Sequence, residues 1–136
     1  MIPAVLTGTH SIGKVERWGA GLQGPEGLAV DAQGRVYAGT RDGRIVRITK
    51  DSHEVIASTG GRPLGMQHDA RGNLIVADAF KGLVSISPDR AITILTDSVA
   101  GKRMLFPDDL DIAQDGVIWF TDASQRFDQH HYILDF

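Results

Sequence analysis

The chain has 136 residues, enough for one domain with its own hydrophobic core. Its 14 basic and 17 acidic side chains give a net charge of −3 without any basic cluster, so we expect no nucleic-acid partner. The absence of cysteine excludes disulfides and thiolate zinc sites. No apolar run approaches the roughly 20 residues that cross a bilayer, and the N-terminus lacks a secretory pattern. We therefore expect a cytoplasmic protein that contacts no membrane.

Four predicted segments follow one another as parts of a single domain that covers residues 1–136. Residues 14–21 are predicted to form one strand that belongs to a neighbouring structural unit. Residues 22–60 and 61–104 each read as four short strands joined by tight turns, and residues 105–136 read as the first half of a third such unit. Gly and Asp punctuate runs rich in Val, Ile and Leu, as hairpin turns and strands require.

The units are repeats of one another. The segments PEGLAVDAQGRVYAGT, PLGMQHDARGNLIVAD and PDDLDIAQDGVIWFTD align without gaps, and their first prolines are 38 and then 44 residues apart. Four short antiparallel strands that recur at about forty residues are typical of a β-propeller. The predicted fold is therefore all-β, a partial propeller of about two and a half four-stranded blades. Propellers close with ~4–8 blades, so this chain does not close one by itself.

Most carboxylates in these repeats have a structural interpretation. Asp31, Asp69 and Asp115 open equivalent turns, where an aspartate side chain accepts backbone hydrogen bonds. Asp78 and Asp122 end equivalent second strands, and we expect each to hold the turn that follows. Among the aromatic residues, Trp119 takes the place that Tyr37 has in the first unit, which predicts that both pack between blades.

The position after each first proline is the exception. The first strand of a propeller blade lines the central channel, so Glu26, Leu64 and Asp108 are expected to face one axis at its entrance. Glu26 and Asp108 then form a candidate metal site, since calcium prefers carboxylate oxygens. The alternative is a pair of hydrated carboxylates at the starts of two strands. His68 lies on a first strand and is a candidate channel-facing base or ligand, or else a partly buried histidine that is hydrogen-bonded within the protein.

A family resemblance rests on three stretches of these repeats. GPEGLAVDAQGRVYAGTRDGRI, GGRPLGMQHDARGNLIVADAFKGL and FPDDLDIAQDGVIWFTDASQRF resemble the strictosidine-synthase-like family of six-bladed propellers, within the superfamily of the SMP-30 protein, gluconolactonases and paraoxonases. The resemblance implies a partial six-bladed propeller, the N-terminal half of the family's fold, in which residues 14–21 resemble the strand that closes the ring. It also implies a small-molecule ligand in the channel.

The resemblance bears on the metal as well. Hydrolases of the wider superfamily bind calcium through a Glu of the first blade and later Asn or Asp residues, which points to Glu26 and Asp108. This chain departs from that pattern, because its only asparagine, Asn73, falls in a turn. Strictosidine synthase itself uses no metal, and its essential glutamate belongs to a late blade that has no counterpart here.

The sequence is compatible with three functions. The first is small-molecule binding at the channel, without a complete active site in this chain. The second is a calcium-dependent lactonase or esterase that self-association completes. The third is a truncated relic or fragment without activity. Open blade edges are a liability that proteins usually cover, so we expect a homodimer that covers them.

Overall fold

A computed structural model describes residue 13 and residues 16–135 of the chain. The first sheet consists of β1 (Leu28–Val30), β2 (Val36–Gly39), β3 (Arg44–Ile48) and β4 (His53–Ser58), in that order and antiparallel throughout. The second sheet repeats the arrangement with β5 (Pro63–His68), β6 (Leu74–Asp78), β7 (Gly82–Ile86) and β8 (Ile92–Thr96). Each sheet is one complete four-stranded blade, and we call them blade 1 and blade 2.

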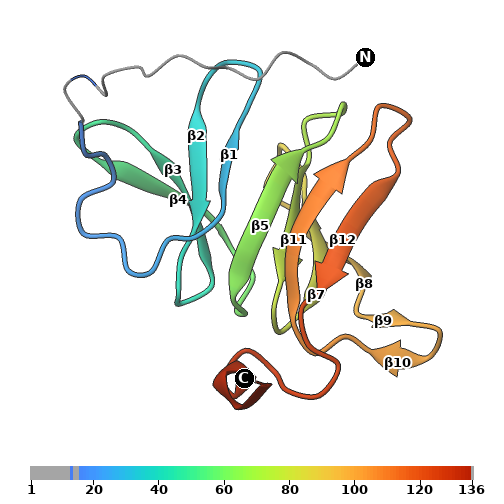
Figure 1. The fold of residues 1–136 in the computed structure, drawn as a ribbon. Coiled ribbons are helices and arrows are strands. Elements are labelled where there is room, and N and C mark those ends of the chain that lie inside the picture. Colours follow the sequence, from blue (N-terminus) through green and yellow to red (C-terminus); the bar gives the residue numbers. More distant parts are fainter. Residues whose placement is uncertain (1–12, 14–15, 136) are drawn as a thin grey trace, which may run out of the picture.

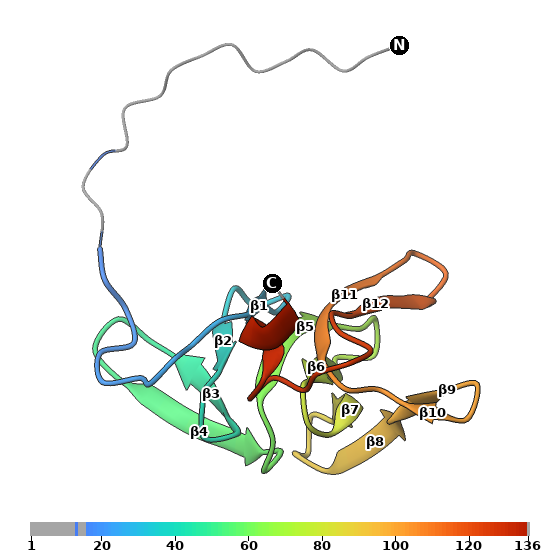
Figure 2. The same ribbon diagram turned by 60° about the horizontal axis from the view of Figure 1, so that its bottom comes forward.

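The third unit contains two strands, β11 (Pro107–Ile112) and β12 (Ile118–Asp122), which pair with each other. We call this pair the half-blade. A small hairpin of β9 (Ser98–Val99) and β10 (Lys102–Arg103) precedes it, and a 3-10 helix, η1 (Tyr132–Asp135), follows it. The three sheets stand side by side, with β1, β5 and β11 innermost and β4 and β8 outermost (Figure 2). This is the arrangement of neighbouring blades in a β-propeller.

Local turn chemistry sets the strand registers. In the turn after β1, the Asp31 carboxylate accepts hydrogen bonds from the backbone N–H groups of Gln33 and Arg35, at 3.0 and 2.9 Å. Gly34 completes this turn with a φ of 75°, in the left-handed region that favours glycine. The prediction of turn-forming aspartates is confirmed here, in the second unit at Asp69 and in the third at Asp115.

The main core lies between the two complete blades. Its buried side chains come from one face of blade 1 and the facing side of blade 2 and are Ala29, Tyr37, Ile45, Met66, Leu74, Val76, Val84 and Ile86. Burying an aliphatic side chain of this size contributes about 1.5–3 kcal/mol relative to leaving it exposed. Blade 2 is therefore held by the packing of its strands against blade 1 as well as by its own hydrogen bonds.

Two sequence-based expectations, a strand over residues 14–21 and the packing of Trp119 between blades, do not agree with the structure. Residues 16–21 form no strand, because a strand needs a hydrogen-bonded neighbour and no described strand pairs with them; residues 14 and 15 lie outside the described part. Leu22, just after them, packs instead on the other face of blade 1. Trp119 does not pack between blades, since it lies on the face of the half-blade that no described strand covers, and 68% of it is exposed.

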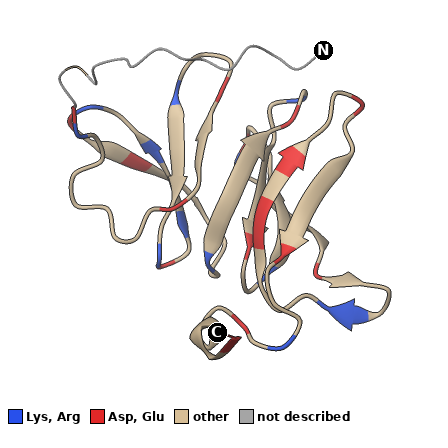
Figure 3. Cartoon of the chain, viewed as in Figure 1, with Lys and Arg blue, Asp and Glu red and all other residues tan. Residues whose placement is uncertain are grey.

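The charges and the termini complete the layout. Acidic residues gather on β11, next to the first strand of blade 2 (Figure 3). Helix η1 lies near the end of the molecule at which β5 and β11 begin (Figure 1). In the part of the chain that the structure describes, no helix has the length and apolar character needed to cross a membrane.

Candidate functional site

The starts of the three first strands form one shallow pocket. Glu26 and Gly27 directly precede β1, Leu64 and Gly65 lie at the start of β5, and Asp108 and Asp109 at the start of β11. Together these six residues line a depression of about 200 Å³, which we call the entrance pocket. The structure thus brings three of the residues singled out from the repeats, Glu26, Leu64 and Asp108, to one place.

Two glycines allow the first strands to approach so closely. A Cβ atom added at Gly27 would lie 2.0 Å from the carbonyl oxygen of Leu64. One added at Gly65 would lie 2.3 Å from a carboxylate oxygen of Asp109. Neither position has room for a side chain, so the backbones of β1, β5 and β11 converge and the residues beside the glycines line a common pocket.

Glu26 is already engaged by an arginine. Its carboxylate forms an ion pair with Nη2 of Arg62, while Nη1 of the same side chain donates to the carbonyl oxygen of Gly24 at 2.8 Å. Arg62 is only 4% exposed, and its backbone N–H donates to the carboxylate of Asp78 at 2.9 Å. Arg62 therefore fixes the position of Glu26 and neutralises part of the charge of the entrance pocket.

Sequence reasoning missed Arg62. The available signal was its position directly before Pro63, at the start of the blade whose entrance residue, Leu64, carries no charge. A buried guanidinium at that point requires a carboxylate partner, and the neighbouring unit supplies Glu26 at the equivalent entrance position.

Asp108 is in a different state from Glu26. Burial raises the pKa of its carboxyl group, and the negative charges of Asp109 and Glu26 raise it further. Among the described residues, none donates a hydrogen bond to this carboxyl group, whereas the Asp109 carboxylate accepts one from the Leu110 N–H at 2.9 Å. The entrance pocket therefore offers one carboxyl group with a raised proton affinity and free hydrogen-bonding capacity.

The donor set does not fit calcium as it stands. Calcium takes 6–8 oxygen ligands, often from several carboxylates. The described residues contain no group of three or more His, Cys, Asp or Glu side chains placed to hold a metal ion. Of the two predicted ligands, Glu26 is bound to Arg62, and burial favours the protonated form of Asp108. Glu26 and Asp108 alone do not form a calcium site.

His68 lies apart from the other predicted site residues. It is the last residue of β5, about 13 Å along the strand from Leu64 at ~3.3 Å per residue. Its ring packs edge-on against Tyr37, with 5.0 Å between the centroids, and it lines a separate groove between the two complete blades. The structure therefore separates His68 from the entrance pocket, because it occupies the far end of a six-residue strand.

Of the two strand-end aspartates, Asp78 holds the turn that follows it, as expected, whereas the Asp122 carboxylate bonds, among the described residues, only to the segment before β11. Asp78 is fully buried and accepts backbone hydrogen bonds from Phe80 and Lys81 in the following turn, at 3.0 and 3.1 Å. Its other carboxylate oxygen accepts the Thr59 hydroxyl at 2.6 Å. Asp122 accepts the backbone N–H of Phe106 at 2.6 Å. Both residues join the end of a second strand to the segment that leads into the first strand.

Comparison with known protein families agrees with this architecture. Residues 12–48 match the family model described as strictosidine synthase-like, N-terminal. The chain is 39% identical over 122 residues to Protein STRICTOSIDINE SYNTHASE-LIKE 6 of Arabidopsis thaliana, an alignment that covers 84% of this chain and 33% of that protein. It is 37% identical to the adipocyte plasma membrane-associated protein of Rattus norvegicus, covering 83% of this chain and 35% of that protein. The chain thus spans about a third of the length of these relatives.

Solved structures give the same fold. A gluconolactonase of Xanthomonas campestris superposes with a TM-score of 0.66 at 27% identity, over 74% of this chain and 35% of that one. A virginiamycin B lyase of Staphylococcus aureus superposes with a TM-score of 0.59 at 15% identity, over 72% of this chain and 34% of the lyase, and supports the fold alone. The prediction of an all-β partial propeller is confirmed, as is the resemblance first seen in the repeats.

Proposed function

Because this chain is a relative of the strictosidine synthase-like proteins, matching about a third of their length, we propose that its entrance pocket binds a small molecule at the mouth of a propeller channel. The observation that carries the proposal is the convergence of Glu26, Leu64 and Asp108, from three successive first strands, on one pocket. Equivalent positions of a repeat converge in this way around the axis of a propeller.

The chemistry of the pocket favours a ligand that donates hydrogen bonds. The Asp108 carboxyl group has a raised pKa, and the described residues leave its oxygens without a donor. Glu26, held by Arg62, presents a second carboxylate that is half-exposed. Leu64, buried between them, supplies an apolar contact. A molecule with hydroxyl or amine groups on a compact apolar frame fits this set, and the chain itself contributes recognition rather than a complete active site.

Ligand binding is testable with the chain as it is. Isotope-labelled protein is titrated with a sugar lactone, a small polyol and a primary arylalkylamine, and chemical-shift changes are followed at the amides of residues 26–28, 64–66 and 108–110. We expect saturable changes there with at least one probe and their loss in Asp108→Asn. Asp115→Asn is the matched control, since Asp115 is an exposed turn residue of the same half-blade. Shifts that persist unchanged in Asp108→Asn would show that the entrance pocket does not bind the probe.

A second candidate function is a calcium-dependent lactonase or esterase completed by self-association. Its support is the 27% identity to a protein described as a gluconolactonase, together with the carboxylates of Glu26, Asp108 and Asp109 in one pocket. Since these carboxylates do not suffice for calcium, a second chain must supply the missing oxygen ligands. A rise of the melting temperature with calcium, together with lactone hydrolysis that Glu26→Gln abolishes, would support this function. If calcium changes neither melting temperature nor hydrolysis, this candidate fails.

The outer face of the half-blade is a candidate surface for self-association. The outer face of the half-blade exposes Trp119, and Val117 beside it is exposed as well. We propose that a second copy covers this face in a homodimer, because a large uncovered aromatic side chain on an open sheet favours association. Light scattering with size-exclusion chromatography gives the mass. A chain that is monomeric, binds none of the three probes and ignores calcium would be an inactive fragment of the fold.

A further inference from the structure

A second cavity lies between the two complete blades, at the opposite ends of the first strands. It is bounded by the turn after β1, the turn after β5 and the turn between β7 and β8, and its volume is about 720 Å³. We call it the inter-blade groove. Small-molecule sites typically occupy ~300–1,000 Å³, so the groove is large enough for an organic ligand.

The floor of the groove is apolar and aromatic. Leu74 and Ile86 from blade 2 and Ile56 from blade 1 line it, and the first two are almost fully buried. Beside them, the rings of Tyr37 and His68 meet edge-on at 70°. His68 Nε2 is buried and has no hydrogen-bond partner among the described residues. The floor therefore suits the apolar body of a ligand.

The rim carries an excess of positive charge. Four arginines line the groove against two carboxylates, although the chain as a whole has a net charge of −3. Both carboxylates, Asp31 and Asp69, are occupied by their own turns. Although burial opposes it, hydrogen bonds from Arg35, Tyr37 and Gln33 lower the pKa of Asp31 to about 2. Asp31 pairs with Arg35, and Asp69 acts on Arg71 through its charge without a hydrogen bond to the guanidinium.

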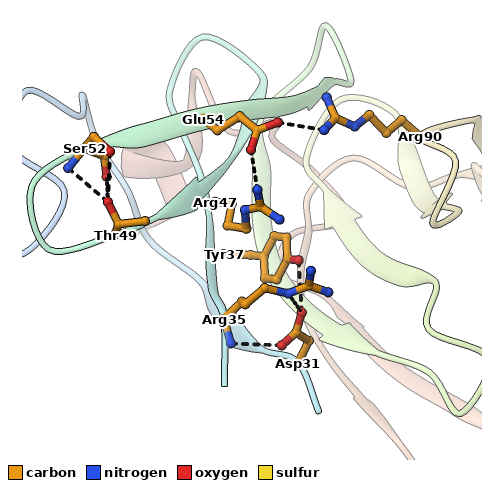
Figure 4. A network of polar contacts seen from close by, with 8 residues as sticks. All are labelled: Asp31, Arg35, Tyr37, Arg47, Thr49, Ser52, Glu54 and Arg90. Carbon is orange, nitrogen blue, oxygen red and sulfur yellow. Dashed lines mark hydrogen bonds and ion pairs between the residues drawn. The ribbon is translucent and has the colours of Figure 1, made fainter. Parts of the chain in front are cut away.

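The arginines approach from both blades. Tyr37, Arg47 and Glu54 are successive cross-strand neighbours and project from one face of blade 1. Arg90, from the turn between β7 and β8, reaches across to the same Glu54 at 2.7 Å (Figure 4). One carboxylate thus serves two guanidinium groups, and it accepts a single Nη2 hydrogen bond from each. Each guanidinium has five N–H donors, so most of their capacity stays available.

Arg71 contributes a third guanidinium group, which, unlike those of Arg47 and Arg90, has no hydrogen-bond partner among the described residues. It is exposed in the turn after β5, and its side chain makes no hydrogen bond to any described residue. Its backbone N–H, by contrast, donates to Asp69 at 2.9 Å and closes the turn. The side chain of Arg71 therefore has no structural role that a ligand would compete with.

We propose that the inter-blade groove binds a small organic oxyanion, a carboxylate or a phosphate monoester, whose apolar body lies on the Leu74–Ile86 floor and whose charged group contacts Arg47, Arg71 and Arg90. Guanidinium groups recognise both kinds of oxyanion through paired N–H donors. The site is independent of the entrance pocket, because the two lie at opposite ends of β5 and share no residue.

The test uses ligands that share one body and differ in charge. Isotope-labelled chain is titrated with phenylacetate, benzyl phosphate, benzyl alcohol and inorganic phosphate, and amide shifts are followed in residues 31–37, 68–74 and 86–91. We expect saturable shifts with at least one of the two organic anions and not with benzyl alcohol at equal concentration. The comparison of phenylacetate with benzyl phosphate identifies the class of anion, and inorganic phosphate shows what the charge contributes alone.

Variants then assign the binding to the arginines. Arg71→Gln should weaken the preferred anion by ~5–20-fold, through the loss of charge-assisted hydrogen bonds. Arg103→Gln, an exposed arginine on β10 outside the groove, should leave binding unchanged. A well-dispersed spectrum of each variant confirms folding, and Arg71→Gln is the decisive one because its side chain supports no other residue.

Three outcomes would overturn the proposal. The first is the absence of saturable shifts with both organic anions at millimolar concentration. The second is equal binding of benzyl alcohol, which would show that the arginines do not recognise the ligand. The third is an equal loss of affinity in Arg71→Gln and Arg103→Gln, which would show that the chain attracts anions without a defined site.

Discussion

Blade 2 and the half-blade begin with the same sequence motif but differ in what surrounds it. Ile75 and Trp119 occupy equivalent positions of the second strand, yet Ile75 is 3% exposed and Trp119 is 68% exposed. Blade 2 stands between blade 1 and the half-blade, whereas no described strand covers the outer face of the half-blade. The motif itself thus specifies a hairpin of defined register, and the neighbouring blades decide whether its side chains form a core.

The aspartates that end these strands show the same contrast. Asp78 in blade 2 is fully buried and accepts hydrogen bonds from the preceding blade as well as from its own turn. Asp122 in the half-blade is partly exposed and accepts two backbone hydrogen bonds, from Leu105 at 3.4 Å and Phe106 at 2.6 Å. The same residue therefore joins two blades in one place and closes a single loop in the other.

The largest expected effect separates these two aspartates. Asp78→Ala should lower the free energy of unfolding by about 3–5 kcal/mol, because it leaves several buried donors without an acceptor. Asp122→Ala should lower it by about 1 kcal/mol. Urea unfolding followed by circular dichroism measures both. Equal losses would mean that burial between blades does not distinguish the two positions.

The next effect concerns Ile75 and Trp119, which occupy equivalent positions of the second strand in blade 2 and the half-blade. Ile75→Ala should cost about 2–5 kcal/mol, as removal of a buried aliphatic side chain does. Trp119→Ala should change the free energy of unfolding by less than about 0.5 kcal/mol, as surface substitutions usually do, and should reduce self-association. Thermal unfolding and solution mass report the two quantities. A large loss of stability in Trp119→Ala, measured at protein concentrations where the chain is monomeric, would contradict the conclusion that this face of the half-blade is uncovered.

A smaller effect is expected where the first strands meet. Gly65 in blade 2 and Asp109 in the half-blade are equivalent positions that lie against each other, and a Cβ atom added at Gly65 would lie 2.6 Å from the Cα atom of Asp109. Gly65→Ala should cost about 1–3 kcal/mol through overpacking against Asp109. Asp109→Ala, which removes the hydrogen bond from Leu110, should cost about 1 kcal/mol or less. Unfolding in urea again provides the comparison, and a neutral Gly65→Ala would show that β5 and β11 lie further apart.

The smallest effect is a dependence on pH at the entrance position, which is Asp108 in the half-blade and the uncharged Leu64 in blade 2. Asp108 has a raised pKa in the folded state, so the folded chain binds more protons than the unfolded one between the two pKa values. Its ionisation therefore lowers stability as the pH rises from the unfolded pKa, about 3.9, through the folded one. Asp108→Asn should raise the melting temperature at pH 7 and make no difference below the unfolded pKa. Leu64→Met, at the uncharged equivalent position of blade 2, should show no such dependence on pH.

Much of the fold follows from the repeats because turns and strands are local features. Gly and Asp residues at equivalent positions of each repeat predict where the hairpin turns lie. The spacing of about forty residues between repeats predicts where each blade begins. The expected strand over residues 14–21 and the packing of Trp119 depend on neighbouring strands that no local pattern describes. In residues 16–21 and at Trp119, the described chain provides no such neighbour.

The entrance pocket was partly accessible from the sequence. Alignment of the repeats placed Glu26, Leu64 and Asp108 at equivalent positions, and equivalent positions converge in a repeat fold. Arg62 was missed because its ion pair with Glu26 joins two units and has no counterpart in the third. The inter-blade groove was missed for a related reason, because its arginines come from turns and strands of two blades and have no common spacing.

The most direct test of the account follows the carboxyl carbon of Asp108 by NMR while the labelled chain is titrated with pH and then with the bound probe. We expect a pKa above the ordinary aspartate range of about 3.9 and a saturable shift of this resonance when the ligand enters the entrance pocket. An Asp108 carboxyl group that titrates in the ordinary range and does not respond to a bound probe would contradict it.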